Sequence, residues 1–539
     1  MSTVHAPGTH PAPPGTPETS GPAVALAPGL PPDPDAARDL ARHLIPDQEL
    51  RPASVAAVSA LPSFASKLAE CERLCGAPYS TLSHTVQDAL VLRRLQQLVH
   101  TVRLNPLWRD RLDGAGIVRA PESLAAWQRI PLSGKDVQRD FFMGTRPGLV
   151  VPLDEGRFEI VASGGTSGGR PLETVYSIRE LHDTYEIAGR FLGTYQLDGR
   201  LTGTDPKWLF TTLADYQMWS SGTMVGGVLQ NVPGVNYVGA GPVTAPVLEH
   251  MFSYRGPKAL MGISAGIAIL GDLGAGMTQQ AKESFRVALY GSGVLPHRKR
   301  AELRAMYPNL EILSYFAATQ AETIGLQLSE DSPDLAAVPG LHLIEIVDER
   351  GHWVEEGEEG ELVVTRLHAH EAPLLRLKLG DRMIRKPRVD GPALRTERFE
   401  FAGRTGDVLH INDSQYSAAR AYAEVRGELA AAEVVDLDDA AHEVQFVNVR
   451  ESRSITLVAA VDDPVSLAFR METVLGAPGI QQVFVNALPR ALSLFNHGEA
   501  NPAYMAQTGY TFDVKFVHRM SPEIKRTDVG KVPLVRDMG

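Results

Sequence analysis

The feature that most constrains the fold is an alternation of short β-rich runs with helix-forming runs, which begins after Pro131. Strands are expected where β-branched and aromatic residues cluster, and helices where apolar residues recur every three to four positions. The expected strands are 207–213, 286–290 and 311–315, and the expected helices are 178–191, 243–251 and 297–306. This alternation predicts a layered α/β domain.

A second, smaller unit is expected at the C-terminal end. After a break at 403–406, the expected order is a strand at 408–411, a helix at 418–429, strands at 444–449 and 456–461, a helix at 465–474 and a strand at 482–485. This order is typical of a small α+β domain. The predicted organisation is a Pro-rich disordered tail at 1–35, a large α/β domain with a leading helical region at 36–403, and a C-terminal lid domain at 404–539.

The composition limits what the chain binds and where it works. Its 539 residues include 52 Lys and Arg against 64 Asp and Glu, and the net charge of −12 disfavours nucleic acid or an anionic membrane as a partner held by charge alone. Its apolar runs are shorter than the ~18–20 residues of a membrane span. A secretory signal has a positively charged start, whereas no Lys or Arg precedes Arg38 here. Cys71 and Cys75 exclude a disulfide framework, and packed or exposed thiols are favoured over a shared metal. We therefore expect a cytoplasmic protein.

The sharpest local feature is the run from Ser163 to Pro171, which contains four glycines and three hydroxyl residues. Because no bulky side chain intervenes, backbone N–H groups can converge on phosphate oxygens, and the run predicts a phosphate-binding loop, with an ordinary turn as the alternative. A P-loop NTPase is excluded, because Arg170 and Pro171 stand where that motif needs Lys and a hydroxyl. A dinucleotide fold is excluded, because no G-x-G-x-x-G opens a helix here.

The same run resembles the phosphate loop of the AMP-forming adenylating enzymes, the superfamily of acyl-CoA synthetases, luciferases and peptide-synthetase adenylation domains. Other segments resemble further motifs of that superfamily, in the same order along the chain. They are the strand end 291–293, the aromatic motif 315–320, the paired segments 357–365 and 373–381, the hinge motif 403–407 and the catalytic-lysine motif 530–531. The segments 112–117 and 130–135 are similar to the phenylacetate-CoA ligase-like branch.

The resemblance implies roles for the matching residues, each of which has a structural alternative such as a solvated lysine, a turn aspartate or a core aromatic ring. Thr166 and Lys531 are expected to be catalytic: Thr166 holds the leaving phosphates, and Lys531, on the lid, contacts the carboxylate and the α-phosphate. Asp381 is expected to bind the ribose hydroxyls, and Arg404 ribose or phosphate. The other expected nucleotide contacts are Ser163, Gly164, Gly165, Ser167, Gly168, Gly291, Ser292, Gly293, Tyr315, Phe316 and Thr319.

Three positions depart from the superfamily pattern. Gln320 replaces a Glu that helps to hold Mg²⁺, so the expected metal donors are Thr166, Gln320 and Glu322, with Glu322 ~6–7 Å further along if the strand continues. Ala317 replaces a glycine and narrows the space beside the nucleotide. Gly406 replaces the usual Asp or Lys of the hinge, and still allows rotation.

The acid is expected to bind among residues that the resemblance places around the aromatic motif. These are Tyr216, Trp219, Gly262, Ser264 and Ala265, with Phe316 beside them. The aromatic and small side chains suit a flat aromatic or short acid, with simple packing as the alternative.

The resemblance thus implies an ATP-dependent, AMP-forming ligase that adenylates a small, aromatic carboxylic acid and transfers the acyl group to a thiol, with CoA as the expected acceptor. ATP and Mg²⁺ are the other expected cofactors. One alternative, motivated by Gln320 and Gly406, is a biosynthetic adenylating enzyme that activates an unusual acid or nitrite for attack by an amine. The other is a non-catalytic nucleotide-binding module, against which Asp381 and Lys531 argue. Related ligases are often homodimers, but the sequence shows no self-complementary surface.

Overall fold

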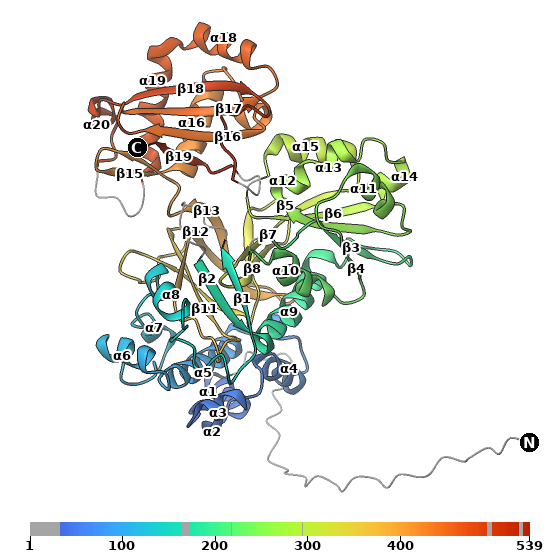
Figure 1. Ribbon diagram of the computed structural model, residues 1–539, viewed down its shortest axis with the longest axis vertical. Coiled ribbons are helices and arrows are strands. Elements are labelled where there is room, and N and C mark those ends of the chain that lie inside the picture. Colours follow the sequence, from blue (N-terminus) through green and yellow to red (C-terminus); the bar gives the residue numbers. More distant parts are fainter. Residues whose placement is uncertain are drawn as a thin grey trace, which may run out of the picture.

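The computed structural model describes residues 33–163, 172–216, 218–293, 295–492, 499–527 and 532–538. A large α/β body carries a smaller α+β domain at its C-terminal end, which confirms the predicted fold class (Figure 1). The N-terminal helices lie at the opposite end of the body from that domain (Figure 1). Within these ranges, none of the helices has the length and hydrophobicity of a membrane-spanning segment.

The body is organised around a sheet of 11 strands in the described part of the chain, in the order β10-β11-β12-β13-β9-β8-β7-β6-β5-β3-β4. The half from β4 to β7 is parallel and the rest is antiparallel. The strands are β3 (Trp208–Thr211), β4 (Asn236–Gly239), β5 (Lys258–Ile263), β6 (Phe285–Gly291), β7 (Glu311–Ala318), β8 (Glu322–Gln327), β9 (Asp334–Ala337), β10 (His342–Val347), β11 (Glu359–Arg366), β12 (Leu377–Asp390) and β13 (Arg395–Arg404). A separate hairpin, β1 (Phe158–Ser163) and β2 (Leu172–Ser177), pairs antiparallel.

Both faces of the parallel half are buried, as expected for strands joined by crossover helices. Successive residues point to opposite faces, so Leu209 packs with one helix layer and Phe210 with the other. The first layer contains α9 (Ile178–Leu192) and α10 (Ser221–Gln230). The second contains α11 (Ala245–Phe252), α12 (Ser264–Ala268), α13 (Leu270–Leu273), α14 (Gln279–Glu283) and α15 (His297–Met306).

A group of helices packs against the antiparallel half and shares its hydrophobic core. These helices are α1 (Pro34–Leu44), α2 (Asp47–Leu50), α3 (Val55–Ser59), α4 (Phe64–Cys75), α5 (His84–Val102), α6 (Pro106–Gly114), α7 (Leu124–Trp127) and α8 (Lys135–Phe142). The predicted tail boundary at 35 is too far along the chain, because α1 begins at Pro34 with Asp33 as its N-cap; residues 1–32 lie outside the described residues. Cys71 is buried in α4 and both thiols are free.

The C-terminal domain has a hydrophobic core of its own, which runs from Leu409 to Phe516. Its sheet has the order β18-β17-β16-β19 in the described residues, beside the hairpin β14-β15. The strands are β14 (Val408–Ile411), β15 (Ser414–Ser417), β16 (Glu443–Val449), β17 (Ser454–Val461), β18 (Thr511–His518) and β19 (Val535–Met538). The helices are α16 (Ala418–Ala431), α17 (Leu437–Ala440), α18 (Pro464–Val474), α19 (Gly476–Ala487) and α20 (Pro502–Gln507).

One predicted element of this domain is wrong. The run 482–485, expected to be a strand, lies inside α19. Ile480, Val483, Phe484 and Ala487 are buried at helical spacing, which explains why β-forming residues adopt a helix here.

Candidate functional site

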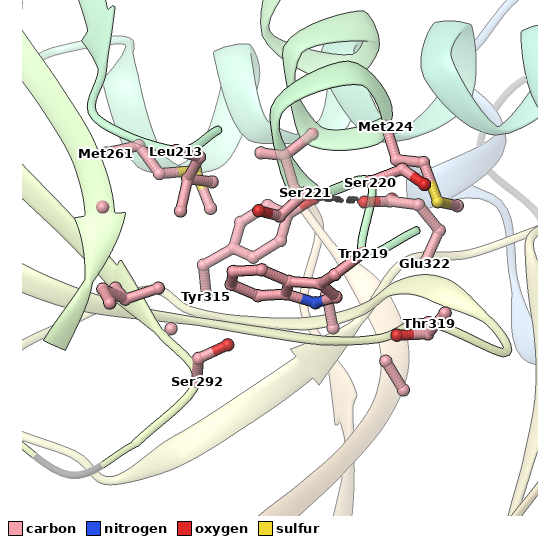
Figure 2. Close-up of a pocket in the computed structure, with 16 residues that line it drawn as sticks. Leu213, Trp219, Ser220, Ser221, Met224, Met261, Ser292, Tyr315, Thr319 and Glu322 are labelled. Atoms are coloured by element: carbon pink, nitrogen blue, oxygen red, sulfur yellow. Dashed lines mark hydrogen bonds between the residues drawn. The ribbon is translucent and has the colours of Figure 1, made fainter. Parts of the chain in front are cut away.

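A cavity lies where β5, β6 and β7 meet the segment that leads into α10, and with the solvent at its open mouth it encloses about 570 Å³ of empty space. Its lining residues are Leu213, Trp219, Ser220, Ser221, Met224, Val225, Met261, Gly262, Ile263, Gly291, Ser292, Tyr315, Ala317, Ala318, Thr319 and Glu322. Figure 2 shows these side chains converging from both sides of the space. In open α/β sheets, ligands bind outside the carboxyl ends of parallel strands, at the point where the strand order reverses. The cavity has that position. Strands β3 and β5 are neighbours, and the chain continues from β3 to β4 on one side, whereas it continues from β5 to β6 on the other side.

The strand ends bring together predicted nucleotide and acid residues. Gly262 is near the end of β5, Gly291 ends β6, and Tyr315 lies in β7. A Cβ on Gly291 would lie 2.8 Å from the backbone oxygen of Tyr315, so this close approach of the two strands requires glycine. Ser292 follows with a φ of 63° and turns the chain away from the sheet.

The segment before α10 carries Trp219 over the cavity. Tyr216 and Trp219 exchange two backbone hydrogen bonds, with N···O distances of 2.9 and 2.8 Å, and the backbone oxygen of Met218 accepts from the N–H of Ala162 at 2.9 Å. This tight turn fixes the indole beside the strand ends. Tyr216 is 51% exposed and is not among the lining residues.

A hairpin returns Glu322 to the cavity. Strand β7 ends at Ala318 and β8 begins at Glu322, with these two residues paired across the antiparallel ladder. The strand does not continue past Gln320, because a turn at 319–321 reverses the chain, so the condition for a displacement of ~6–7 Å is not met. Thr319 and Glu322 both line the cavity as a result.

Buried hydrogen bonds hold the Glu322 carboxylate. Tyr315 Oη donates to Glu322 Oε1 at 3.3 Å, and Thr323 donates to Oε2 through its N–H and its hydroxyl. Burial raises the pKa of Glu322 to about 7, against the lowering effect of the Thr323 and Tyr315 hydrogen bonds. Burial and the negative charge of Glu322 also raise the pKa of Tyr315 well above its usual value.

The turn of this hairpin is anchored by two residues that the sequence did not indicate. Tyr176, in β2, donates its hydroxyl to the carbonyl of Thr319 at 2.9 Å, and Arg366, at the end of β11, donates Nε–H to the carbonyl of Gln320 at 2.7 Å. Arg366 also donates to the carbonyl of Val175 at 3.0 Å. Both side chains are buried, so the turn is tied to two other strands.

Asp381 and Arg404, predicted to contact ribose, form an ion pair with an N···O distance of 3.2 Å. They face each other across β12 and β13, directly before the C-terminal domain. Asp381 is buried, and Arg404 has a half-exposed side chain. The N–H of Thr405 donates to the carbonyl of Gly380 at 2.8 Å, which fixes the chain where the two domains join.

Besides Tyr216, three residues expected to contact the acid do not line the cavity. Phe316 packs against Phe399 and Phe401, with ring centroids 6.4 and 6.1 Å apart, because alternate residues of β7 face opposite sides of the sheet. Ser264 begins α12 beside Gly293, and Ala265 is exposed on the same helix. Phe316, Ser264 and Ala265 are therefore not part of this cavity wall, and their contact with the acid stays a prediction.

Several predicted residues lie outside the described residues. They are Gly164, Gly165, Thr166, Ser167, Gly168 and Lys531. Ser163 is the last residue of β1. The catalytic roles of Thr166 and Lys531 stay predictions.

Of the predicted metal donors, the structure describes Gln320 and Glu322, whereas Thr166 lies outside the described residues. Gln320 offers a neutral amide, and the Glu322 carboxylate is already bonded to Tyr315 and Thr323. Throughout the described ranges, no group of three or more His, Cys, Asp or Glu side chains is arranged to hold a metal ion.

Sequence reasoning missed seven of the residues that line the cavity. The missed residues are Leu213, Ser220, Ser221, Met224, Val225, Met261 and Ile263. All lie within a few positions of Trp219 or Gly262, so the signal was proximity to predicted residues, and only the fold shows which neighbours face inwards.

The comparisons with known proteins identify the fold. Searches against protein-family models and curated protein sequences find no match. Among solved structures, 2-hydroxyisobutyryl-CoA ligase in the postadenylation state, in complex with 2-HIB-AMP, is similar with a TM-score of 0.63 and 17% identity, over 85% of this chain and 91% of the ligase. An open conformation of the same ligase with 2-HIB-AMP and CoA gives 0.55 and 16% identity, over 85% and 93%. The chain has the fold of this AMP-forming acyl-CoA ligase.

Proposed function

We propose that this chain is an ATP-dependent, AMP-forming ligase that joins a small carboxylic acid to the thiol of CoA. One observation carries the proposal. Trp219 and Gly262, predicted from the resemblance to bind the acid, line the same cavity as Gly291, Ser292 and Thr319, predicted to bind the nucleotide. A single space bordered by both groups is what the joining of an acid to a nucleotide requires.

The proposed reaction has two steps. In the first, a carboxylate oxygen attacks the α-phosphorus of ATP, the bond to the β-phosphate breaks and pyrophosphate leaves. In the second, the sulfur of CoA attacks the acyl carbon, the thiol proton is lost and AMP leaves. Both steps bring negative groups together, so donors and positive charge at the reacting atoms are the main catalytic need.

The residues proposed for these tasks come from several elements. Thr166 and the loop amides would hold the leaving phosphates, and Lys531 would bridge the carboxylate and the α-phosphate. Asp381 would accept hydrogen bonds from ribose, with Arg404 beside it at 3.2 Å. Because Lys531 belongs to the C-terminal domain, the proposal requires that domain to close over the strand ends. Mg²⁺ would arrive as part of the ATP complex.

The comparison with solved structures supports both steps. 2-Hydroxyisobutyryl-CoA ligase has been captured with an acyl-adenylate and, in another state, with the adenylate and CoA. This fold therefore accommodates an adenylate and a thiol acceptor in that ligase. A cytoplasmic location is part of the proposal, because both cysteines are free thiols.

The cavity wall supports a flat, largely apolar acid. Trp219 and Tyr315 offer aromatic surfaces, and Met224 and Met261 are flexible apolar side chains that adapt to a ring or a short chain (Figure 2). An aromatic acid is the substrate that we propose.

The test is exchange of labelled pyrophosphate into ATP across a panel of aromatic and aliphatic acids. The proposal expects exchange that depends on the acid, and it is wrong if no acid supports exchange. Mass spectrometry with and without CoA then identifies the acceptor. A thioester that forms only with CoA supports CoA transfer, whereas an amide formed without CoA supports the amine-dependent alternative.

A further inference from the structure

The cavity contains one charged side chain among the described residues that line it. Glu322 is 2% exposed, and its neighbours in the lining are apolar, hydroxyl or glycine residues. Removing a carboxylate from water costs several kcal/mol unless a partner compensates. A glutamate at this position therefore lowers the stability of the fold unless another group compensates its charge.

The backbone adds a second cost at the same residue. Glu322 has a φ of 58°, in the left-handed region that residues with a Cβ rarely adopt. Strained conformations of this kind persist where the surrounding structure enforces them, and they cluster at functional sites. Here the tight return from β7 to β8 enforces the strain and aims the side chain at the cavity (Figure 2).

The partners of the carboxylate within the described residues leave it without a compensating positive charge. Tyr315 and Thr323 are neutral donors, and none of the influences on the pKa of Glu322 comes from a Lys, Arg or His. Oε2 accepts from both donors of Thr323, whereas Oε1 accepts from Tyr315 at 3.3 Å. A carboxylate oxygen has two lone pairs, so Oε1 has the capacity to accept from a ligand.

Negative charge also acts beside the cavity, at Tyr185, which packs in one apolar cluster with the lining residue Met224. The half-buried Tyr185 has a raised pKa, first because of burial and then because of the negative charges of Glu159, Glu322 and Asp215. Three carboxylates therefore act on one half-buried point. Their field favours a positively charged ligand group over a neutral one.

We infer that this cavity selects acids that carry an amino group remote from the reacting carboxylate, with Glu322 Oε1 accepting a hydrogen bond from that group. The inference rests on the proposed function and names the substrate class of the same site. The apolar walls hold the carbon skeleton of the acid, and Glu322 distinguishes an amino group from an alkyl group at the far end of that skeleton. This assigns the Glu322 carboxylate to acid recognition and not to a metal ion.

Matched pairs of acids test the inference by equilibrium binding to the full-length protein, measured by calorimetry without ATP. The first pair compares para-aminomethylbenzoate, which carries an alkylammonium group, with para-ethylbenzoate. The second pair compares para-aminobenzoate, which carries an aryl amine, with para-toluate. At about pH 8 the alkylammonium is protonated. We expect the amine of at least one pair to bind about ten-fold or more tightly than its partner, as for a charge-assisted hydrogen bond.

The variant Glu322→Gln keeps the shape and removes the charge, and it is expected to reduce that preference to about two-fold or less. Glu356→Gln, at an exposed position, is the charge-matched control and should keep the preference. If Glu322→Gln does not fold, Glu322→Asp replaces it, and a preference weaker than in the wild type is expected. Equal binding within both pairs in the wild type, absence of binding by every acid, or an unchanged preference in a folded Glu322→Gln overturns the inference.

Formation of AMP with the same acids separates this inference from the proposed function. If amines bind preferentially but no acid yields AMP, the proposed function is wrong and the selectivity stands. If AMP forms equally well from amino and des-amino acids that bind equally, the selectivity is wrong and the proposed function stands.

Discussion

The guanidinium carbon of Arg366 lies 3.8 Å from the ring centroid of Tyr176, in a buried stack that joins β11 to β2. The stacked pair supports consecutive carbonyls of one turn, those of Thr319 and Gln320. That turn returns the chain to Glu322. Two side chains that are distant in the sequence therefore hold part of the cavity wall in place. The stack and the carbonyls of Gln320 and Val175 give the buried guanidinium its partners.

Removing these contacts should weaken both stability and activity. Tyr176→Phe loses one buried hydrogen bond and should lower the free energy of unfolding by about 1 kcal/mol, while Arg366→Lys loses the planar stack and two donors and should cost about 2 kcal/mol or more. Urea denaturation measures both. Arg73→Lys, at a side chain that is 67% exposed, is the matched control and should have no measurable effect. A stability of Arg366→Lys equal to that of the control would contradict this account.

The buried carboxyls predict how stability depends on pH. Burial raises the pKa of Glu322 from 4.5 to about 7, and burial and the neighbouring Glu371 raise that of Glu180 to about 7. Between these values the folded protein binds more protons than the unfolded chain, so these groups should make the free energy of unfolding fall as pH rises from about 4.5 to about 7.

Glu322→Gln isolates one share of this dependence. The variant should gain stability relative to the wild type as pH rises through this range, and the difference should level off above about pH 7. Urea denaturation at a series of pH values measures it. A difference that does not change with pH would show that Glu322 does not titrate in this way.

The C-terminal domain is held to the body by a buried acidic residue. Glu359, in β11, forms ion pairs with Arg382 of the neighbouring strand and with Arg420 of α16. Arg420→Ala removes only the contact between domains, so the domain should move away more often and expose the chain after Arg404 to trypsin. If the ion pair between Glu359 and Arg420 stabilises the contact between the domains by ~1 kcal/mol, the rate of cleavage should rise about five-fold.

The control for that experiment is Arg450→Ala, which breaks an ion pair with Asp537 inside the C-terminal domain. It should leave cleavage after Arg404 unchanged. Equal rates in the wild type and Arg420→Ala would show that the contact with Glu359 does not hold the domain.

The close approach at Gly291 gives a prediction about the cavity itself. The Cβ of Gly291→Ala would lie 2.8 Å from the carbonyl oxygen of Tyr315, so the strand ends must separate. We expect a loss of about 1–3 kcal/mol in the free energy of unfolding and a raised KM for ATP. Gly427→Ala, where an added Cβ meets nothing within 4 Å, should be neutral or slightly stabilising in its exposed helix. An unchanged KM in Gly291→Ala would place the nucleotide elsewhere.

Much of the fold follows from local pattern. The helix at 297–306 and the strand at 408–411 match α15 and β14 residue for residue, because turn-forming residues bound both runs: Pro296 and Pro308 the first, Gly406 and Asn412 the second. The run at 482–485 misled because Val483, Phe484 and Val485 favour strands, whereas their burial in α19 depends on neighbours that the sequence does not show.

The candidate site was only partly predictable, for a different reason. Trp219, Gly291 and Tyr315 sit in motif-like segments, and they do line the cavity. Arg366 and Glu322 could not be placed from sequence. The contacts of Arg366 come from two distant strands, and the direction of Glu322 depends on a turn that reverses the chain within three residues.

The central claim is that a carboxylate displaces pyrophosphate from ATP with the help of Lys531. The most direct test measures the products of ATP hydrolysis and transfer with each acid, for the wild type, Lys531→Ala and the control Lys525→Ala, whose lysine is exposed. The account predicts AMP and pyrophosphate in equal amounts, only with an acid present, with a loss of about 100-fold in Lys531→Ala and none in the control. Production of ADP, or AMP formation that survives Lys531→Ala undiminished, would contradict it.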